Sequence, residues 1–145
     1  MMSTLERAIE IAVRVHAGRK DKAGAPYILH PLRVMLKLTA PEEQITAVLH
    51  DVIEDSQGET RVTIGDLRQE GFSETVIRAV DSVTKRKNET YNQYILRAAS
   101  NPIGRRVKLA DLEDNCDLSR IANPTRPDQE RIDKYRRAIE LIMKC

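Results

Sequence analysis

One imidazole and three carboxylates lie within the six residues His50-Asp51-Val52-Ile53-Glu54-Asp55. On an α-helix, residues four apart are neighbours, so His50 would lie over Glu54. Asp51 would lie over Asp55 in the same way, which brings all four polar groups to one side of the helix. Such a side suits a divalent metal ion that activates water, but an exposed polar face of a helix has the same pattern.

Apolar residues around this segment repeat at helical spacing and place it on the third of a series of helices. This helix is predicted to begin at Pro41, to bury a stripe from Ile45 to Ile53 and to end near Ser56-Gln57-Gly58. Before it, Ser3-x-x-Glu6 predicts a capping box, and His30-Pro31 predicts a short helix with His30 as its N-cap. The sequence therefore predicts an all-α bundle of about eight helices. The later helices are expected over 63–69, 73–84, 90–100, 101–119 and 128–144.

A chain of 145 residues can bury a sizeable core, and it is expected to form one domain over residues 1–145. No apolar run is long enough for a transmembrane helix, and the first residues lack the apolar region of a signal peptide. These features predict a cytoplasmic protein without a membrane partner. Cys116 and Cys145 form no zinc or disulfide motif, and both are expected to be reduced thiols, with Cys116 filling the core.

Charge and aromatic content argue against a nucleic-acid partner. The formal net charge is only +2, from 24 Lys and Arg and 22 Asp and Glu, whereas nucleic-acid-binding domains are usually strongly basic. One Phe, four Tyr and no Trp leave few rings on which bases can stack. The basic clusters at 85–87, 105–108 and 131–137 are expected to be solvated faces.

A further carboxylate of interest lies on the helix predicted over 101–119. Asp111 falls beside Val107 and Ala110 on the apolar side of this helix. Arg105 and Lys108 fall on the polar side. A carboxylate in Asp111's position is partly desolvated and needs a partner, which is a metal ion or, alternatively, an arginine or the end of a neighbouring helix.

The three histidines of the chain differ in their settings. His30 follows the semi-rigid segment Gly24-Ala25-Pro26-Tyr27-Ile28-Leu29 and stands where a loop meets a helix. There it could ligate a metal, cap the helix or make a hydrogen bond in the core. His16 lies on the apolar stripe of the first helix and is interpreted as a structural histidine.

Taken in order, His30, His50-Asp51 and Asp111 resemble the pattern of the HD superfamily of metal-dependent phosphohydrolases, helical domains in which two His and two Asp bind one divalent ion. The chain is more closely similar to the hydrolase domain of RelA/SpoT-type stringent-response enzymes and to the free-standing small alarmone hydrolases. The likeness covers most of the chain, from about Leu5 to the last helix. The segments that carry it are His16-Ala17-Gly18, Lys22 to Leu32, Leu49 to Asp55, Val83-Thr84-Lys85 and Val107 to Asn115.

The resemblance implies a metal ion that is usually manganese in this family, although the ligand types also suit zinc or iron. It implies as well that Glu54 and Asp55 orient the attacking water and take its proton, which a purely structural ion would not need. The expected reaction removes the 3′-pyrophosphate of guanosine tetra- or pentaphosphate, ppGpp or pppGpp, and yields GDP or GTP. The expected metal ligands are His30, His50, Asp51 and Asp111.

On the substrate side, the resemblance implies that Lys22 and Asn115 contact the nucleotide and that Tyr27 shapes the pocket. The family commonly has an Arg-Lys pair before its Gly-x-Pro-Tyr segment, but here Asp21 takes the first of these positions. Arg19 or Lys20 is the expected replacement for the missing cation. Added acids also follow the last metal aspartate, where they are unfavourable beside a polyphosphate unless they point away. These acids are Glu113, Asp114 and Asp117.

These features predict a metal-dependent phosphohydrolase that acts on a small nucleotide, in a chain with no room for an alarmone synthetase domain. One alternative keeps the chemistry but changes the substrate to another nucleotide or phosphoester, because Asp21 alters the substrate loop. Another is a regulatory module that binds metal or alarmone without turnover. The intact pair Glu54 and Asp55 argues against this second alternative.

Overall fold

The computed structural model describes residues 2–145 and confirms the predicted all-α fold. Over these residues, nine α-helices and one short 3-10 turn are found instead of about eight helices, because the helix expected to begin at Pro41 is broken in two. The only pairing of extended backbone within this range is a single antiparallel bridge between Lys20 and Pro26. The elements are α1 (Leu5–His16), α2 (Leu29–Leu36), α3 (Pro41–Leu49), α4 (Val52–Asp55), η1 (Gly58–Thr60), α5 (Ile64–Gln69), α6 (Glu74–Ser82), α7 (Tyr91–Ala99), α8 (Pro102–Asn115) and α9 (Arg126–Met143).

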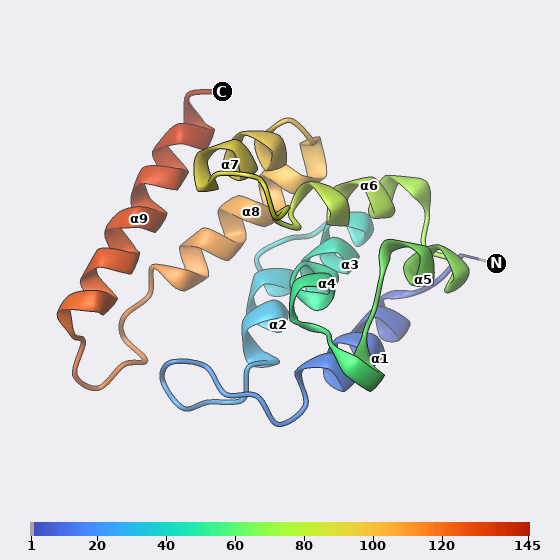
Figure 1. Ribbon diagram of the computed structural model, residues 1–145, viewed down its shortest axis with the longest axis horizontal. Coiled ribbons are helices and arrows are strands. Elements are labelled where there is room, and N and C mark those ends of the chain that lie inside the picture. The colour runs from blue at the N-terminus through green and yellow to red at the C-terminus, as the bar shows by residue number, and fades with distance from the viewer. Residues whose placement is uncertain (1) are drawn as a thin grey trace.

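Helix α3 lies at the centre of the bundle (Figure 1) and packs against α1, α2, α6 and α8. Its last turn is apolar, and Ala47, Val48 and Leu49 are fully buried. Val48 and Leu49 join a core with residues of α1, α5 and α6, whereas Ala47 joins a second core with α2, α7 and α8. Full burial of such a Val or Leu contributes about 1.5–3 kcal/mol. The C-terminal end of α3 is therefore fixed between two cores.

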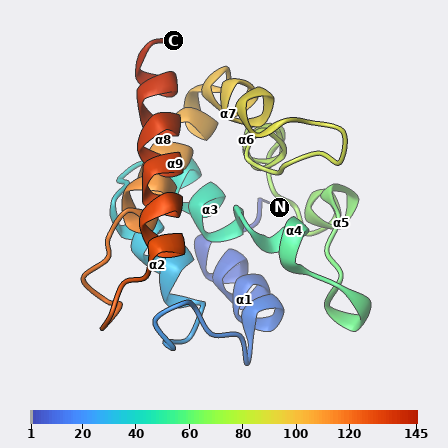
Figure 2. The same ribbon diagram turned by 60° about the vertical axis from the view of Figure 1, so that its left-hand side comes forward.

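Helix α9 closes one end of the bundle, where it packs against α7 and α8 (Figure 2). Its residues Ala138 and Ile142 form a third core with Tyr94 of α7 and Leu112 of α8. Helix α8 thus lies between two cores, which encloses the side chain of Asp111. Even α9, the longest helix described, lacks the apolar run that a membrane span requires, and so do the other helices within residues 2–145.

The chain leaves its helical path between Leu49 and Val52. His50 N bonds the carbonyl oxygen of Ala47 at 3.4 Å, three residues back, and His50 Nδ1 donates to the same oxygen at 2.6 Å. Asp51 then adopts φ −104° and ψ −2°, far from the helical averages of about −63° and −42°. A side chain that competes for a backbone carbonyl weakens the helical ladder. The predicted continuous helix is wrong at this point.

The first two helices begin at other residues than predicted. Thr4 caps α1, because its side chain accepts from Arg7 N at 3.1 Å, so the capping box expected at Ser3 is not formed. Helix α2 begins at Leu29, which places His30 inside the first turn and not at the N-cap. Ser and Thr are both good caps, and at the start of α1 the Ser3 N–H donates to the carbonyl oxygen of Gly71 at 2.9 Å.

Two later helix ends also differ. Helix α8 ends at Asn115, before the predicted 119, and α9 begins at Arg126, before the predicted 128. The reason for the early start is a capping box between Thr125 and Asp128, which the sequence reading overlooked. Cys116, expected to fill the core, follows α8 and is only half-buried.

Candidate metal centre

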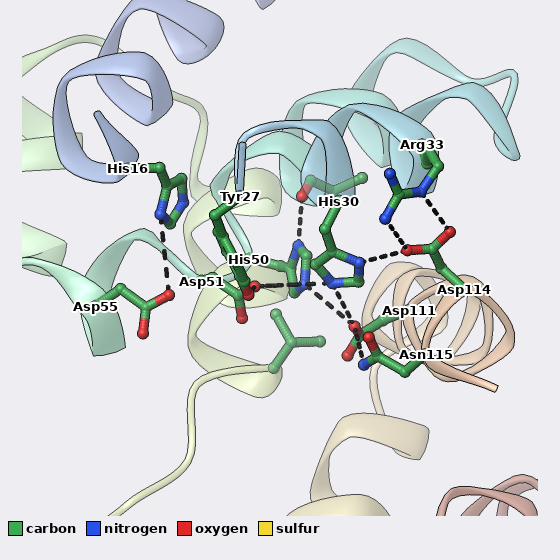
Figure 3. A network of polar contacts seen from close by, with 12 residues as sticks. His16, Tyr27, His30, Arg33, His50, Asp51, Asp55, Asp111, Asp114 and Asn115 are labelled. Carbon is green, nitrogen blue, oxygen red and sulfur yellow. Dashed lines mark hydrogen bonds and ion pairs between the residues drawn. The ribbon is translucent and has the colours of Figure 1, made fainter. Parts of the chain in front are cut away.

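The four predicted ligands converge between α2, the α3–α4 break and α8 (Figure 3). His30 Nε2 lies 2.9 Å from Asp111 Oδ1 and 3.8 Å from Asp51 Oδ2. His50 Nε2 lies 3.1 Å from Asp51 Oδ2 and 3.4 Å from Asp111 Oδ1. The fold therefore brings together three separate parts of the chain, namely residue 30, the pair 50–51 and residue 111.

The imidazole geometry fits a metal ion. His50 Nδ1 donates to the carbonyl oxygen of Ala47, so in the neutral ring the lone pair is on Nε2, and Nε2 has no hydrogen-bond partner among the described residues. Metal-bound histidines commonly donate their other ring N–H in this way. Atoms held by one ion at about 2.0–2.2 Å lie roughly 3 Å apart, which is close to the spacings above. Ligand atoms of His30, His50 and Asp51 all lie within 4.8 Å of one another.

The carboxylates of this cluster favour nearby positive charge. Asp111 is only 4% exposed. Although burial acts in the opposite direction, the charges of Asp51 and Asp111 raise the pKa of His50 well above its ordinary value. At Asp111, burial alone would raise the pKa of the carboxyl. The positive charges of Lys108 and His50 outweigh this effect and hold the pKa well below its usual range. Protonated imidazoles or a divalent cation can supply the charge that such a cluster favours.

Lys108 belongs to this cluster, so the prediction of a solvated face is wrong for this residue. Its side chain is buried, and Nζ donates to Asp111 Oδ2 at 2.9 Å and to Tyr94 Oη at 3.0 Å. The ammonium group also lies over the Tyr94 ring, 4.7 Å from its centre. Residues three apart on a helix are neighbours, and this spacing was the signal for the contact with Asp111.

Asp114 also contacts the cluster, and sequence reasoning treated it only as an unfavourable acid near a phosphate. It is 4% exposed, and its Oδ2 accepts from His30 Nδ1 at 2.7 Å. Arg33 donates to the same carboxylate, from Nε to Oδ1 at 2.8 Å and from Nη2 to Oδ2 at 3.0 Å. The signal for burial was the place of Asp114 on the apolar side of α8, whereas nothing in the sequence singled out Arg33.

Tyr27 reaches the cluster from the loop before α2. Its hydroxyl donates to Asp51 Oδ2 at 2.5 Å, and its ring lies between His16 and His30, with centroid distances of 4.9 and 5.7 Å. Burial, followed by the charge of Asp51, raises the pKa of the Tyr27 phenol. Tyr27 therefore remains a hydrogen-bond donor to a candidate metal ligand.

Glu54 and Asp55, the predicted water-handling pair, face different neighbours. Glu54 Oε1 accepts from the backbone N–H of Lys85 at 2.6 Å. Desolvation outweighs this hydrogen bond and raises the pKa of Glu54. Asp55 Oδ2 lies 2.8 Å from Arg19 Nη1, yet burial and the charge of Asp51 raise the pKa of Asp55 as well. Both carboxyl groups are thus stronger bases than free side chains.

A cavity of about 510 Å³ adjoins the cluster and extends to α9. His30 lies in its wall, and so does Asn115, which donates to Asp111 Oδ1 at 3.1 Å. Six cationic and three acidic side chains line the cavity, a balance that favours an anionic ligand. All four residues predicted to meet the substrate line it: Arg19, Lys22, Tyr27 and Asn115. Lining residues that the sequence did not single out, or placed on a solvated face, are Arg33, Arg120, Arg131 and Tyr135.

The loop around Asp21 accounts for one departure from the family pattern. Asp21 Oδ1 accepts from the backbone N–H groups of Ala23 and Ala25, both at 2.9 Å. Its carboxylate therefore holds the turn that leads into α2. Arg19, one of the two expected replacement cations, lies over the Tyr27 ring with its guanidinium 4.7 Å from the ring centre. The other, Lys20, also lines the cavity.

An all-helical bundle that gathers two histidines and two aspartates, in the chain order His, His-Asp, Asp, defines an HD-type domain. No protein-family model matches the chain. A solved structure described as a metazoan ortholog of SpoT that hydrolyses ppGpp has the same fold, with a TM-score of 0.73 over 95% of this chain and 84% of that one, at 22% identity.

Curated relatives narrow the family. The chain is 38% identical over 123 residues to a guanosine-3′,5′-bis(diphosphate) 3′-pyrophosphohydrolase of Aquifex aeolicus. The match covers 77% of this chain and 17% of the relative. It is 34% identical over 150 residues to a GTP pyrophosphokinase of Streptomyces coelicolor, and the match covers 94% of this chain and 17% of the relative. It is 30% identical over 142 residues to the bifunctional (p)ppGpp synthase/hydrolase SpoT of Escherichia coli, and the match covers 88% of this chain and 19% of the relative.

The chain spans less than a fifth of the length of these relatives. Fold, site and relatives together support the resemblance found in the sequence. In fold and sequence the chain resembles the HD-type hydrolase domain of the RelA/SpoT enzymes.

Proposed function

We propose that this chain is a divalent-metal-dependent phosphohydrolase that removes the 3′-pyrophosphate of ppGpp and pppGpp, giving GDP or GTP and pyrophosphate. The observation that carries the proposal is the buried cluster of two histidines and two aspartates beside a cation-lined cavity. The printed names of the Aquifex and Escherichia relatives support this substrate. A single domain over residues 1–145 and a cytoplasmic location stay predictions.

Mn²⁺ is the proposed ion on the strength of the family resemblance, and mixed imidazole and carboxylate ligands suit it, as they also suit zinc or iron. When bound, such an ion lowers the pKa of coordinated water and neutralises phosphate charge. Tyr27 would keep Asp51 Oδ2 in place through its hydroxyl. The ion would be held by His30, His50, Asp51 and Asp111.

Glu54 is the proposed proton acceptor for the attacking water. The N–H of Lys85 engages Oε1, so Oε2 would take the proton. The raised pKa of Glu54 improves it as a base. Asp55 is paired with Arg19, and we assign it the role of orienting groups around the water.

The cavity would bind the nucleotide with its phosphates toward the cationic wall. Lys22 and Arg131 lie in that wall, and Arg33 lies where the cavity meets the metal cluster. Tyr135 and Ile132 of α9 offer the apolar surface that a base requires. The charge balance of the wall fits the multiple negative charges of the proposed substrate.

The proposal is tested by incubating the purified chain with Mn²⁺ and a nucleotide panel that includes ppGpp and pppGpp, followed by chromatography of the products. We expect pyrophosphate release from these two nucleotides, and its loss in Asp51→Ala and Glu54→Ala. Glu59→Ala, which alters an exposed acid on η1, should keep full activity. Turnover of other panel members alone would contradict the substrate assignment but not the chemistry. Metal or nucleotide binding without any turnover would instead favour the regulatory module.

A further inference from the structure

Asp114 completes a line of polar contacts behind the metal cluster. Its Oδ2 accepts from His30 Nδ1 at 2.7 Å, whereas His30 Nε2 lies 2.9 Å from Asp111 Oδ1 inside the cluster. The side chains of His30 and Asp114 are both nearly inaccessible to solvent. A carboxylate only accepts hydrogen bonds, so the Nδ1 atom of His30 must carry a proton.

Two arginines hold Asp114 from the other side. Arg33 donates to both carboxylate oxygens, in the forked geometry that fixes a carboxylate firmly. Arg120 Nη2 donates to the backbone oxygen of Asp114 at 3.1 Å and lies 3.7 Å from Oδ2. The negative charge of Asp114 is therefore compensated, and its position is set by groups outside the metal cluster.

The two candidate imidazole ligands need different anchors. A backbone carbonyl, that of Ala47, accepts from His50 Nδ1. The corresponding nitrogen of His30 has a side-chain acceptor instead, and Asp114 supplies it. Asp114 does not line the cavity, whereas its neighbours Asn115 and Asp117 do. This added acid thus faces a histidine and not the nucleotide.

We infer that Asp114 is a positioning residue that orients the His30 ring, directs Nε2 toward the ion and increases the basicity of that nitrogen. The inference rests on the proposed function, since it takes His30 as a metal ligand. Its expected consequence is a metal affinity that depends on a residue outside the ligand set.

The experiment measures Mn²⁺ affinity without nucleotide, from the electron paramagnetic resonance signal of the free ion. Loss of a hydrogen-bond partner behind a ligand typically weakens metal affinity about 10–100-fold. We expect about 100-fold for Asp114→Ala and about tenfold for Asp114→Asn, which keeps an acceptor oxygen but not the charge. Glu113→Gln removes one charge from an exposed position in the same helical turn and should leave the affinity unchanged.

A spectroscopic readout separates positioning from stability. In ¹H–¹⁵N spectra of the metal-free protein, Nδ1 of His30 should carry a proton in the wild type and in Glu113→Gln. In Asp114→Ala, Nδ1 has lost its acceptor whereas Nε2 still faces Asp111 Oδ1 at 2.9 Å, so the proton should lie mainly on Nε2. Circular dichroism checks that each variant is folded. If Asp114→Ala does not fold, the Mn²⁺ affinity of Asp114→Asn decides whether Asp114 positions His30.

Wild-type Mn²⁺ affinity in folded Asp114 variants would overturn the inference. A wild-type chain that binds Mn²⁺ but hydrolyses no nucleotide would refute the proposed function, and the affinity comparison would still decide the role of Asp114.

Discussion

Glu54 has a carboxyl pKa above its ordinary value of 4.5, because desolvation outweighs the hydrogen bond from Lys85. A general base must be ionised, so hydrolysis should decline as the pH falls through this raised pKa. Glu54→Gln removes the base and should lower kcat by about 10²–10⁴-fold without changing Mn²⁺ affinity. Steady-state rates across the pH range check both points, with Glu59→Gln as the control. Full activity in Glu54→Gln would exclude Glu54 as the base.

His16 is buried, and neither ring nitrogen has a hydrogen-bond partner among the described residues. Burial lowers its pKa from 6.5 to about 4. Between these values the unfolded chain binds a proton that the folded chain does not, so the free energy of unfolding decreases as the pH falls from about 6.5 toward 4. Between about pH 7 and pH 4.5, the free energy of unfolding of His16→Leu should decrease by about 2 kcal/mol less than that of the wild type. Urea unfolding at both pH values provides the test, and equal pH dependence in the two proteins would contradict it.

The sequence was sufficient to nominate the ligands, because imidazole and carboxylate side chains at this spacing have a definite chemistry. It was not sufficient to find what holds them. The carboxylate that anchors His30 lies 84 residues further along the chain, and Lys108 looked like a solvated cation until Asp111 was seen to be buried beside it. Contacts of this kind depend on how helices dock, which local patterns do not determine.

At the scale of elements, periodicity predicted the helices well and their ends less well. The break after Leu49 has no Gly or Pro to mark it, and it arises from the competition of His50 Nδ1 for a backbone carbonyl. The start of α1 was ambiguous because Ser3 and Thr4 are both good caps. The break is thus set by a local hydrogen bond, whereas at the start of α1 the Ser3 N–H has a distant partner, the carbonyl oxygen of Gly71 at 2.9 Å.

The packing of α8 against α6 and α7 depends on Gly104. A Cβ atom there would overlap Ser82 Oγ and lie 3.1 Å from the carbonyl oxygen of Ala98. Ser82 Oγ is itself held by a hydrogen bond to a backbone oxygen, so it cannot move away freely. Gly104→Ala should therefore destabilise the fold by about 1–3 kcal/mol.

Helix α5 provides a matched control for this substitution. A Cβ atom on Gly65 would meet only Thr63 Oγ1, at 3.6 Å. Gly65→Ala should therefore be neutral or stabilise the fold by up to about 1 kcal/mol, as is usual for this change in a helix. Thermal and urea unfolding of both variants measure the difference. Equal effects at the two positions would show that α8 is not packed as described.

At the scale of the whole molecule, the candidate ligands connect α2, the α3–α4 break and α8. An ion that binds only the folded chain should raise the free energy of unfolding by about 2.7 kcal/mol at 100 times its Kd. Chelation should reverse this stabilisation. Thermal unfolding with Mn²⁺ and with a chelator checks the prediction, and Asp51→Ala should show no response. A response in Asp51→Ala equal to that of the wild type would place the ion elsewhere.

His30 meets Asp111 and Asp114 across 81 and 84 residues of chain. Contacts between such distant residues form late in folding, because closing a long loop costs entropy before the contact forms. The four candidate ligands therefore meet only in a chain whose α8 is docked against α2 and α3. Binding of the ion would thus depend on the tertiary structure of the whole domain, and a chain in which α8 is undocked would lack Asp111 and the anchor of His30.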